Sequence, residues 1–404
     1  MTAALRQRAG RRAIVLVIDA CGVGALPDAA LYGDEGANTL AHVAEAVGGL
    51  RLPTLTRLGL GTILPLAGVP AVRCPSVHGR LHALGPGKDS TAGHWELMGV
   101  VVAQAPPTYP EGFPPRVLAR LERAMGHRVI GNRACDGLVA IEEHGAEHLR
   151  SGALILYTSA DSVLQLAAHV DRIPPPELYR ACAAARAAMT GEHAVGRVIA
   201  RPFAGHAGAF TRTGGRRDYA LAPPRASYLD AITAAGVPVH AVGKVAELFA
   251  GAGVSEAHPA TTNEQALAAT ERLIEALPGG LVFTNLIETD QVYGHRRDSE
   301  GFHRALQQID AAIGRWLERL GPEDLLIVTA DHGVDPITPG TDHTREYVPL
   351  LAVAGAGNGA GTGRAQGATS RPGRHDGPLA DVGATALRWL TGADSDELPG
   401  RPFL

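Results

Sequence analysis

The sequence predicts an α/β protein with a mostly parallel sheet and a second domain inserted into the first. Short apolar runs rich in β-branched residues alternate with longer stretches of helical periodicity, the pattern of βαβ units. A middle stretch that opens with the proline-rich segment APPTYPEGFPP breaks this alternation. The length of 404 residues corresponds to two or three domains of about 150 residues each.

The core sheet is expected from five apolar segments, with four helical segments packed on it. The strands are expected at 13–19, 238–244, 280–286, 324–331 and 348–354, and the helices at 39–47, 226–235, 263–277 and 299–320. In the last helix, apolar side chains recur every three or four residues between Phe302 and Leu317. Such a face is typical of a helix that lies across a sheet.

The inserted domain is expected at 104–218, so that the core domain consists of 1–103 and 219–404. The insert should contain strands at 153–158 and 196–203 and helices at 116–125 and 176–189. A stretch near the other end, 355–377, is rich in Gly, Ala, Thr and Arg and predicts an exposed loop.

The composition fits a globular, loop-rich protein with a small ligand. Hydrophobic residues make up 45% of the chain and charged residues 19%, which excludes a disordered chain and a coiled coil. The net charge is −4, from 37 basic and 41 acidic residues, and no block of like charge occurs. We therefore expect no nucleic acid and no anionic membrane surface as a partner, and we infer no obligate protein partner.

The N-terminal residues predict a buried strand rather than a targeting segment. The apolar run AIVLVI has six residues and ends at Asp19, with no small-residue cleavage site nearby. No apolar run approaches the roughly 18 residues that span a bilayer. The four cysteines are far apart and form no CxxC pair, so we expect neither a zinc knot nor a disulfide framework. A cytoplasmic location follows as the default.

Three of the expected core strands end in residues that bind metals. Asp19 ends the first, Asp331 and His332 end the strand LLIVTADHG, and Asp290 and His295 follow the strand VFTNL. In the segment GTDHTREY, His343 lies close enough along the chain to join them. Because the carboxyl ends of parallel strands meet at one crevice, we expect all six side chains to converge.

Three carboxylates and three imidazoles form a mixed oxygen and nitrogen set. Such a set suits a pair of divalent ions such as Mn²⁺ or Zn²⁺ better than Ca²⁺ or a thiolate-bound metal. A single Asp after a strand is more often a helix cap or a turn former. Six converging groups favour a metal centre, since a buried Asp331 without a partner would cost several kcal/mol.

The segment GPGKDSTAGHWELMG contains a candidate nucleophile. Ser90 lies among small residues just before an expected helix, where a hydroxyl beside two cations can lose its proton. The alternative is that Ser90 caps the helix. The phosphate-loop motif GxxxxGK[ST] is not met, because Asp89 follows Lys88, and Pro27 breaks GxGxxG in GVGALP. Nucleotide binding through either motif is not expected.

Seven segments resemble the phosphopentomutases, a family of the alkaline phosphatase superfamily. The segments are VIDACGVGALPDA, GKDSTAGHWELMG, YTSADSVLQLAAH, VGRVIARPF, FTRT, GHRRD and TADHGVDPITPGTDHTREYVPLL. The resemblance extends from about Arg12 to Thr385, nearly the whole chain. It implies an alkaline-phosphatase-like core, with a mostly parallel central sheet and helices on both faces, and an inserted α/β cap domain.

The resemblance also implies an activity and a set of site residues. The family exchanges phosphate between C1 and C5 of ribose or deoxyribose, with two Mn²⁺ ions and a sugar bisphosphate such as glucose 1,6-bisphosphate as activator. By position, Asp19, Asp331 and His332 would bind one ion, Asp290, His295 and His343 the other, and Ser90 would contact both and carry the phosphoryl group. The implied contacts to the pentose phosphate are Ser159, Asp161, Arg197, Ile199, Arg212 and Lys244.

Two departures from the family pattern affect specific positions. Ser90 stands where the family usually has Thr, which keeps the hydroxyl and loses the methyl group. In the segment GNRACDGLVAIEEHG, Cys135, Asp136 and Leu138 replace residues of the family's ASGT sequence. Every implied metal ligand is kept, but the surface that selects the sugar is altered.

Four alternative functions are weighed against this interpretation. The chain could be a mutase for a different pentose phosphate, or a metal-dependent phosphomonoesterase that releases inorganic phosphate. A metal-dependent phosphoglycerate mutase is disfavoured, because SADSVLQ and DPITPGTDHTREYVP match the pentose enzyme better. A non-catalytic metal-binding scaffold would require a missing ligand or nucleophile, and none is missing.

Overall fold

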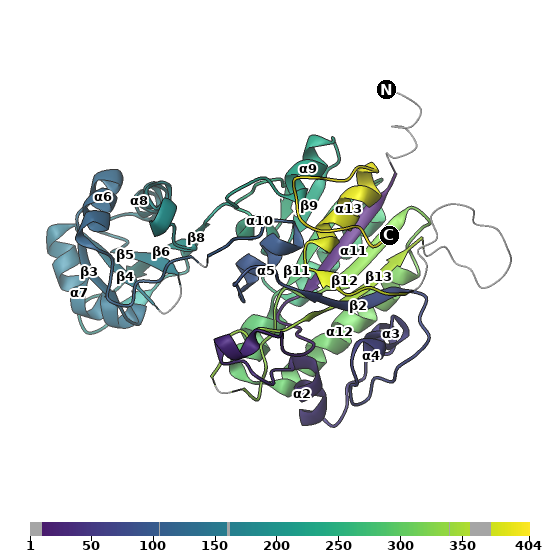
Figure 1. The fold of residues 1–404 in the computed structure, drawn as a ribbon. Coiled ribbons are helices and arrows are strands. Elements are labelled where there is room, and N and C mark those ends of the chain that lie inside the picture. Colours follow the sequence, from purple (N-terminus) through teal and green to yellow (C-terminus); the bar gives the residue numbers. More distant parts are fainter. Residues whose placement is uncertain (1–9, 105, 160–161, 339, 356–372) are drawn as a thin grey trace. The chain divides into compact units, whose positions relative to one another are not determined.

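The computed structural model describes residues 10–104, 106–159, 162–338, 340–355 and 373–404, and it divides into two compact units (Figure 1). Unit 1 consists of Met1–Gln104 and Pro223–Leu404, and unit 2 of Ala105–Ala222. Unit 2 therefore interrupts unit 1 in sequence. It begins one residue later and ends four residues later than the insert expected at 104–218.

Within the described residues, unit 1 contains a nine-stranded sheet. The main path runs β10-β9-β11-β1-β12-β13-β2-β14, and β15 also pairs with β2. The strands are β1 (Arg12–Ile18), β2 (Val77–His82), β9 (Val239–Val242), β10 (Glu256–His258), β11 (Gly280–Leu286), β12 (Asp324–Thr329), β13 (Val348–Ala354), β14 (Gly373–Arg374) and β15 (Gly377–Pro378). From β10 to β12 all neighbours are parallel, whereas β13 runs antiparallel to both β12 and β2. The predicted α/β class with a mostly parallel sheet is confirmed.

The core strands have the bounds that their apolar runs predict, to within a few residues. Every residue of β1, β11 and β12 is buried, as expected for parallel strands covered on both faces. The expected strand at 238–244 ends two residues early, because Gly243 leaves the extended conformation with φ +76°. Of the loop expected at 355–377, residues 356–372 lie outside the described residues, and β14 and β15 pair with β2 instead of forming loop.

Helices cover both faces of this sheet (Figure 1). They are η1 (Ala29–Tyr32), α2 (Thr39–Ala46), α3 (Pro53–Arg57), α4 (Leu60–Ile63), α5 (Ser90–Leu97), α9 (Tyr228–Ala234), α10 (Val245–Leu248), α11 (Asn263–Ala276), η3 (Thr289–Tyr293), η4 (Gly294–Arg296), α12 (Ser299–Leu317) and α13 (Asp381–Thr391). Adjacent residues of β11 point to opposite faces. The ring of Phe283 packs against His94 of α5, while the hydroxyl of Thr284 hydrogen-bonds Thr270 of α11 at 2.7 Å. Helices therefore lie on each side of the central strands.

Unit 2 is a smaller α/β unit with its own mixed sheet. Its strands are β3 (Val129–Ala134), β4 (Leu154–Thr158), β5 (Val163–His169), β6 (Arg197–Ala204), β7 (Thr211–Arg212) and β8 (Arg217–Ala220), in the order β3-β4-β5-β6-β7 with β8 also on β6. Its helices are α6 (Pro115–Met125), α7 (Gly137–Ser151), α8 (Pro175–Ala188) and η2 (Gly191–His193). Apolar side chains of α6 and α8 pack on one face of the sheet, and those of α7 pack on the other.

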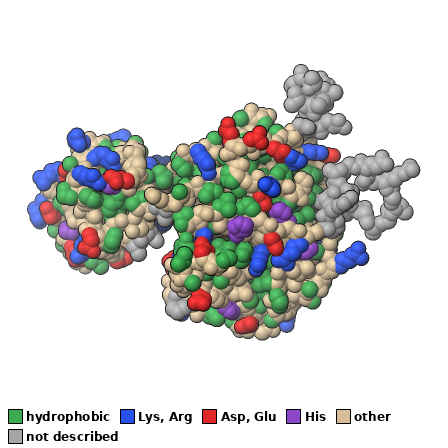
Figure 2. Space-filling model, in the orientation of Figure 1, with side chains coloured by type: hydrophobic (Ala, Val, Ile, Leu, Met, Phe, Trp, Pro, Cys, Tyr) green, Lys and Arg blue, Asp and Glu red, His purple; other side chains and the backbone are tan. Residues whose placement is uncertain are grey.

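The described residues offer no helix that is long and apolar enough to cross a membrane. Acidic and basic side chains are interspersed on the face of unit 1 shown in Figure 2. All four cysteines are free thiols.

A buried histidine joins α7 to the sheet of unit 2. Nε2 of His148 accepts a hydrogen bond from the backbone N–H of His169 at 2.9 Å, so the ring proton must be on Nδ1, which donates to the carbonyl of Ala153 at 2.7 Å. Burial lowers the pKa of His148, and the nearby His169 and Arg172 lower it further. The neutral ring is therefore part of the folded structure.

We predict that unit 2 loses stability as the pH falls through about 6.5, the pKa of an unfolded histidine. The folded state binds fewer protons there, because the pKa of His148 is lowered. Below this pH, the free energy of unfolding falls by up to about 1.4 kcal/mol per pH unit for one such group. Hydrogen exchange of the backbone amides of β4 and β5, compared at pH 7.5 and 5.5, measures this change in free energy. Replacement His148→Ala should weaken this pH dependence, and the exposed control His206→Ala should keep it; equal pH dependence in all three proteins would contradict the assignment.

Candidate functional site

The first group of expected metal ligands meets where two central strands end. Asp19 follows β1, and Asp331 and His332 follow β12, which is parallel to β1 and beside it. All three residues are at most 4% exposed. Nε2 of His332 lies 3.3 Å from Oδ1 of Asp19 and 3.5 Å from Oδ2 of Asp331.

The second group gathers around Asp290. This residue lies in η3 just beyond β11, His295 lies in η4, and His343 lies in the connection from β12 to β13. Oδ1 of Asp290 is 3.3 Å from Nε2 of His295 and 3.4 Å from Nε2 of His343. Within each group of three, one donor atom per residue lies within 4.8 Å of the others.

The two groups are neighbours. The ring centroids of His332 and His343, which belong to different groups, are 4.1 Å apart. The structure thus brings together all six side chains that the sequence proposed as ligands.

The donor atoms of these side chains suit divalent cations. Among the described residues, Oδ1 of Asp290, Oδ2 of Asp331 and Nε2 of His343 are buried and have no hydrogen-bond partner of good geometry. Oδ2 of Asp331 does lie 3.1 Å from Nδ1 of His94, but that nitrogen hydrogen-bonds the carbonyl of Ser90 instead. Buried polar atoms are rarely left without a partner, and carboxylate oxygens and imidazole nitrogens are ordinary ligands of divalent metals.

The electrostatics show how strongly this site needs positive charge. Burial and the neighbouring carboxylate of Asp331 raise the pKa of Asp19 to about 6. Burial disfavours the charged form of Asp331, yet the imidazoles of His332 and His94 hold its pKa well below the usual range. The hydrogen bond to Asp290 raises the pKa of His295 to about 9. Protons on imidazoles thus balance the carboxylates, a role that cations can take over.

Ser90 faces the first group from the start of helix α5. Its Oγ donates to Oδ1 of Asp19 at 3.3 Å and lies 3.1 Å from Nε2 of His332. The helix cap is Asp89, whose side chain accepts the N–H groups of Thr91 and Ala92. The alternative that Ser90 serves as the cap is therefore wrong, and its hydroxyl is directed at the candidate metal ligands.

The close approach of α5 to this site depends on a glycine. A Cβ atom at position 93 would lie 2.4 Å from the backbone oxygen of Asp331. Gly93 therefore allows the helix that carries Ser90 to pack directly on the strand end that carries Asp331.

Three supporting residues were not foreseen from the sequence. His94 follows Ser90 by one helical turn and contacts Asp331, and Asn285 donates to Oδ2 of Asp19 at 3.2 Å. Glu346 is buried and accepts hydrogen bonds from Thr39 and Thr344. Two of these residues could have been identified from the sequence. His94 lies four residues after Ser90, one helical turn further along, and Asn285 lies near the end of its strand.

A polar pocket of about 420 Å³ opens in unit 2, on the face of the sheet that also carries α7. It is lined by Ala134, Cys135, Asp136, Gly137, Tyr157, Ser159, Gln165, Arg201 and Arg212. Two of the expected sugar-phosphate contacts, Ser159 and Arg212, are thus brought together. Asp161 lies outside the described residues.

The other expected contacts lie elsewhere in the fold. Arg197 and Ile199 lie on β6; the former is 3.8 Å from Asp218, and the side chain of the latter is buried. Lys244 belongs to unit 1, where it precedes helix α10.

The pocket also contains residues that the sequence did not reveal. Nε of Arg201 donates to Oε1 of Gln165 at 3.1 Å, and the hydroxyl of Tyr157 is buried without a partner among the described residues. Two of the residues that depart from the family pattern, Cys135 and Asp136, also line this pocket, where Asp136 caps α7 and lies 3.6 Å from Arg212. The pocket thus combines two arginines with an unpaired hydroxyl at the start of a helix.

Comparisons with known proteins give a consistent relationship. Residues 11–392 match the model of the metalloenzyme superfamily. The chain is 49% identical over 342 residues to the phosphopentomutase of Carboxydothermus hydrogenoformans, covering 84% of this chain and 88% of that one. It is 46% identical over 394 residues to the phosphopentomutase of Anaeromyxobacter sp. (strain K), covering 96% and 97%. Among solved structures, Leishmania mexicana phosphoglycerate mutase aligns with a TM-score of 0.47 at 14% identity, covering 96% of this chain and 97% of that one.

We predict that Asp331→Asn lowers the content of tightly bound divalent metal by at least one ion per chain. Asparagine keeps the shape of the Asp331 side chain but lacks its negative charge. Elemental analysis of the dialysed protein measures the change. A matched control is Asp310→Asn, since Asp310 is equally buried and caps α3 through Thr54 and Leu55. That control should lose about 1 kcal/mol of stability and no metal. Full metal content in Asp331→Asn would remove this residue from the site.

Proposed function

Because the chain belongs to the phosphopentomutase family of isomerases, we propose that it interconverts the 1-phosphate and 5-phosphate of ribose or deoxyribose. The resemblance read from the sequence is confirmed by relatives that match most of the chain. One observation carries the mechanistic part of the proposal: the hydroxyl of Ser90 contacts Asp19 and His332 of the first candidate ligand group, beside which the second group lies. We assign the enzyme to nucleoside salvage in the cytoplasm, a location that its four free thiols support.

In this proposal Asp19, Asp331 and His332 would hold one divalent ion, and Asp290, His295 and His343 would hold the other, with Mn²⁺ suggested by family resemblance. Such ions, when bound, would supply positive charge that neutralises the phosphoryl group during transfer. The unpartnered donor atoms of Asp290, Asp331 and His343 support this assignment.

Ser90 is the residue that carries the phosphoryl group. Its Oγ forms a bond to phosphorus as an ester bond of the sugar bisphosphate breaks, and the monophosphate leaves. Phosphoserine then passes the group to the free hydroxyl of an incoming pentose phosphate, which becomes a bisphosphate. Return of the other phosphate to Ser90 completes the isomerisation. Asp19 orients the hydroxyl through the 3.3 Å hydrogen bond.

Unit 2 is proposed as the substrate-binding cap domain. Ser159 and Arg212 of its pocket would contact the pentose phosphate, together with Asp161, Arg197 and Ile199 of the same unit and Lys244 of unit 1. A guanidinium suits a phosphate because it can form charge-assisted, paired hydrogen bonds. Arg201 adds a second guanidinium to the same pocket.

A mutase for a different pentose phosphate is the second candidate. Cys135 and Asp136 line the pocket where the family pattern differs, and the carboxylate of Asp136 lies beside Arg212. A negative charge at this point would change which sugar hydroxyl or phosphate the pocket accepts.

We predict that manganese-loaded protein converts ribose 1-phosphate to ribose 5-phosphate when primed with glucose 1,6-bisphosphate. A phosphorus NMR time course should show the 5-phosphate without inorganic phosphate. Release of inorganic phosphate would favour the phosphomonoesterase instead, and conversion of another pentose phosphate alone would favour the second candidate.

The same assay tests the nucleophile. Ser90→Ala should lower the rate by at least about a thousandfold, because the substitution removes the hydroxyl that would accept the phosphoryl group. Thr91→Ala is the control, since Thr91 is the neighbouring hydroxyl residue on the same helix. If Thr91→Ala abolished turnover and Ser90→Ala did not, the assignment of Ser90 would be wrong.

We predict that Arg212→Met raises the KM for the pentose phosphate roughly 10- to 100-fold, through the loss of a charge-assisted hydrogen bond. Steady-state kinetics measure the change. The control Arg123→Met alters an exposed arginine of α6, which packs on the opposite face of the unit 2 sheet. An unchanged KM in Arg212→Met would exclude Arg212 from substrate binding.

A further inference from the structure

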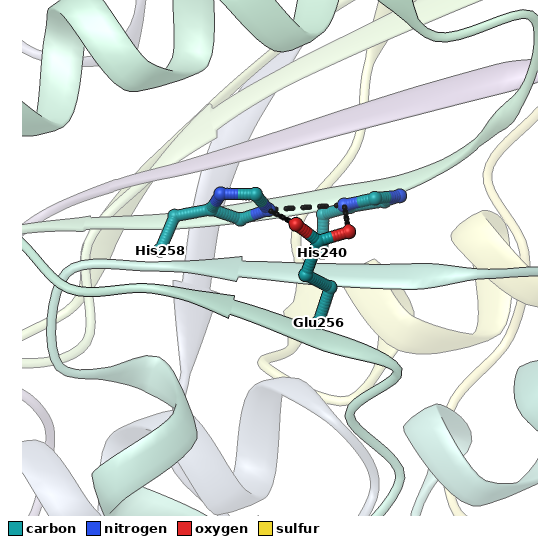
Figure 3. Close-up of side chains that lie close together, drawn as sticks. All are labelled: His240, Glu256 and His258. Atoms are coloured by element: carbon teal, nitrogen blue, oxygen red, sulfur yellow. Dashed lines mark hydrogen bonds and ion pairs between the residues drawn. The ribbon is translucent and has the colours of Figure 1, made fainter.

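A third group of potential metal ligands lies at the edge of the unit 1 sheet. His240 is on β9, and Glu256 and His258 are on the neighbouring edge strand β10 (Figure 3). In the parallel register Glu256 pairs with His240, and His258 lies two residues further along the same strand. Side chains two residues apart on a strand point to the same face of the sheet, so Glu256 and His258 share a face. His240, the register partner of Glu256, presents its side chain on that same face.

The donor atoms of this group point at one another. Nδ1 of His240 lies 3.0 Å from Nε2 of His258. The carboxylate of Glu256 lies between the rings in Figure 3, with one oxygen 3.6 Å from His240 Nδ1 and the other 3.8 Å from His258 Nε2. The two rings are stacked, with centroids 5.3 Å apart and an angle of 26° between their planes.

These spacings are those of ligands around a small cation. Zinc binds imidazole nitrogen at about 2.0–2.1 Å in tetrahedral geometry, which places two ligand atoms about 3.3 Å apart. The two ring nitrogens lie 3.0 Å apart, and they lie 3.6 and 3.8 Å from different oxygens of the carboxylate. One donor atom from each residue lies within 4.8 Å of the other two, so small rotations of the side chains can direct all three donors at a common centre.

The protonation state also favours a cation. Burial lowers the pKa of His240, and the neighbouring His258 lowers it further, so the ring is neutral at pH 7 and keeps a nitrogen lone pair. His240 is 6% exposed, whereas 62% of the Glu256 side chain is exposed. The carboxylate thus provides both a negative charge and access from solvent.

We propose that His240, Glu256 and His258 bind a divalent transition-metal ion of the zinc type, separate from the ions of the Ser90 site. Two imidazoles and one carboxylate are a ligand set that zinc uses, with water in the fourth position. As the ion binds, the proton between the two rings is transferred through solvent to the ring nitrogen that faces away from the ion, so both histidines bind as neutral imidazoles. Because β10 has three residues and forms the edge of the sheet, the ion clamps this strand to β9 and stabilises the unit.

The experiment compares bound zinc in three full-length proteins after removal of metal, reloading with Zn²⁺ and dialysis. The double variant His240→Ala/His258→Ala should hold one zinc ion per chain fewer than the parent. The control His206→Ala, an exposed histidine of unit 2, should hold as many as the parent. Equal zinc in the parent and the double variant would overturn the proposal. Phosphopentomutase activity of the manganese-loaded double variant should be unchanged, which separates this site from the proposed function.

A milder variant and a direct observation guard against misfolding of the double variant. Glu256→Gln changes an exposed carboxylate to an amide and should weaken zinc binding at this site at least about tenfold. Crystals of the zinc-loaded parent should show an anomalous scattering peak among the three side chains. No peak there, with the two nitrogens still at hydrogen-bond distance, would mean that the group is a histidine pair joined by a hydrogen bond.

Discussion

The structure of unit 1 depends on bringing three buried carboxylates together at the carboxyl ends of its central strands. Asp19, Asp290 and Asp331 follow three adjacent parallel strands, so the sheet register itself places like charges together. Two such charges within about 4.8 Å repel by roughly 3 to 4 kcal/mol at an effective dielectric constant of 20. Burial first, and then this repulsion from Asp331, raise the pKa of Asp19 to about 6. Positive charge offsets this repulsion: protons on the imidazoles do so without metal, and the two divalent ions of the proposed site would take their place.

The same constraint explains the arrangement around the site. Because the strand ends are fixed by hydrogen bonding across β11, β1 and β12, the remaining groups must reach them from connections and helices. His343 arrives on the connection to β13, which returns antiparallel, and Ser90 arrives on α5, which a glycine allows to pack closely. Asn285 then holds the carboxylate of Asp19 in place, and His94 lies 3.1 Å from the carboxylate of Asp331. Rigid support of this kind is what phosphoryl transfer needs, since its rate depends mainly on position and charge.

Much of the core and the convergence of all six candidate ligands could be predicted from the sequence. Five of the six follow a continuous apolar run whose strand ends beside the others, and His343 lies close to Asp331 along the chain. Other features depend on contacts between distant segments. The polar alternation of VHGRLH hides β2, whose side chains are alternately buried, and nothing in the apolar run of β13 reveals that it is antiparallel. The partnership of Arg201 with Gln165 arises only when β5 and β6 pair. The pairing of His240 with Glu256 and His258 likewise needs the register of β9 and β10.

If Ser90 accepts a phosphoryl group beside the clustered candidate ligands, the phosphorylated chain can be trapped. Manganese-loaded protein is incubated with glucose 1,6-bisphosphate, quenched in acid and digested, and its peptides are sequenced by mass spectrometry. We expect phosphate on Ser90, formed only when metal is present and removed when ribose 1-phosphate is added. Phosphate on Thr91, or an unmodified Ser90 in a protein that turns over, would contradict it.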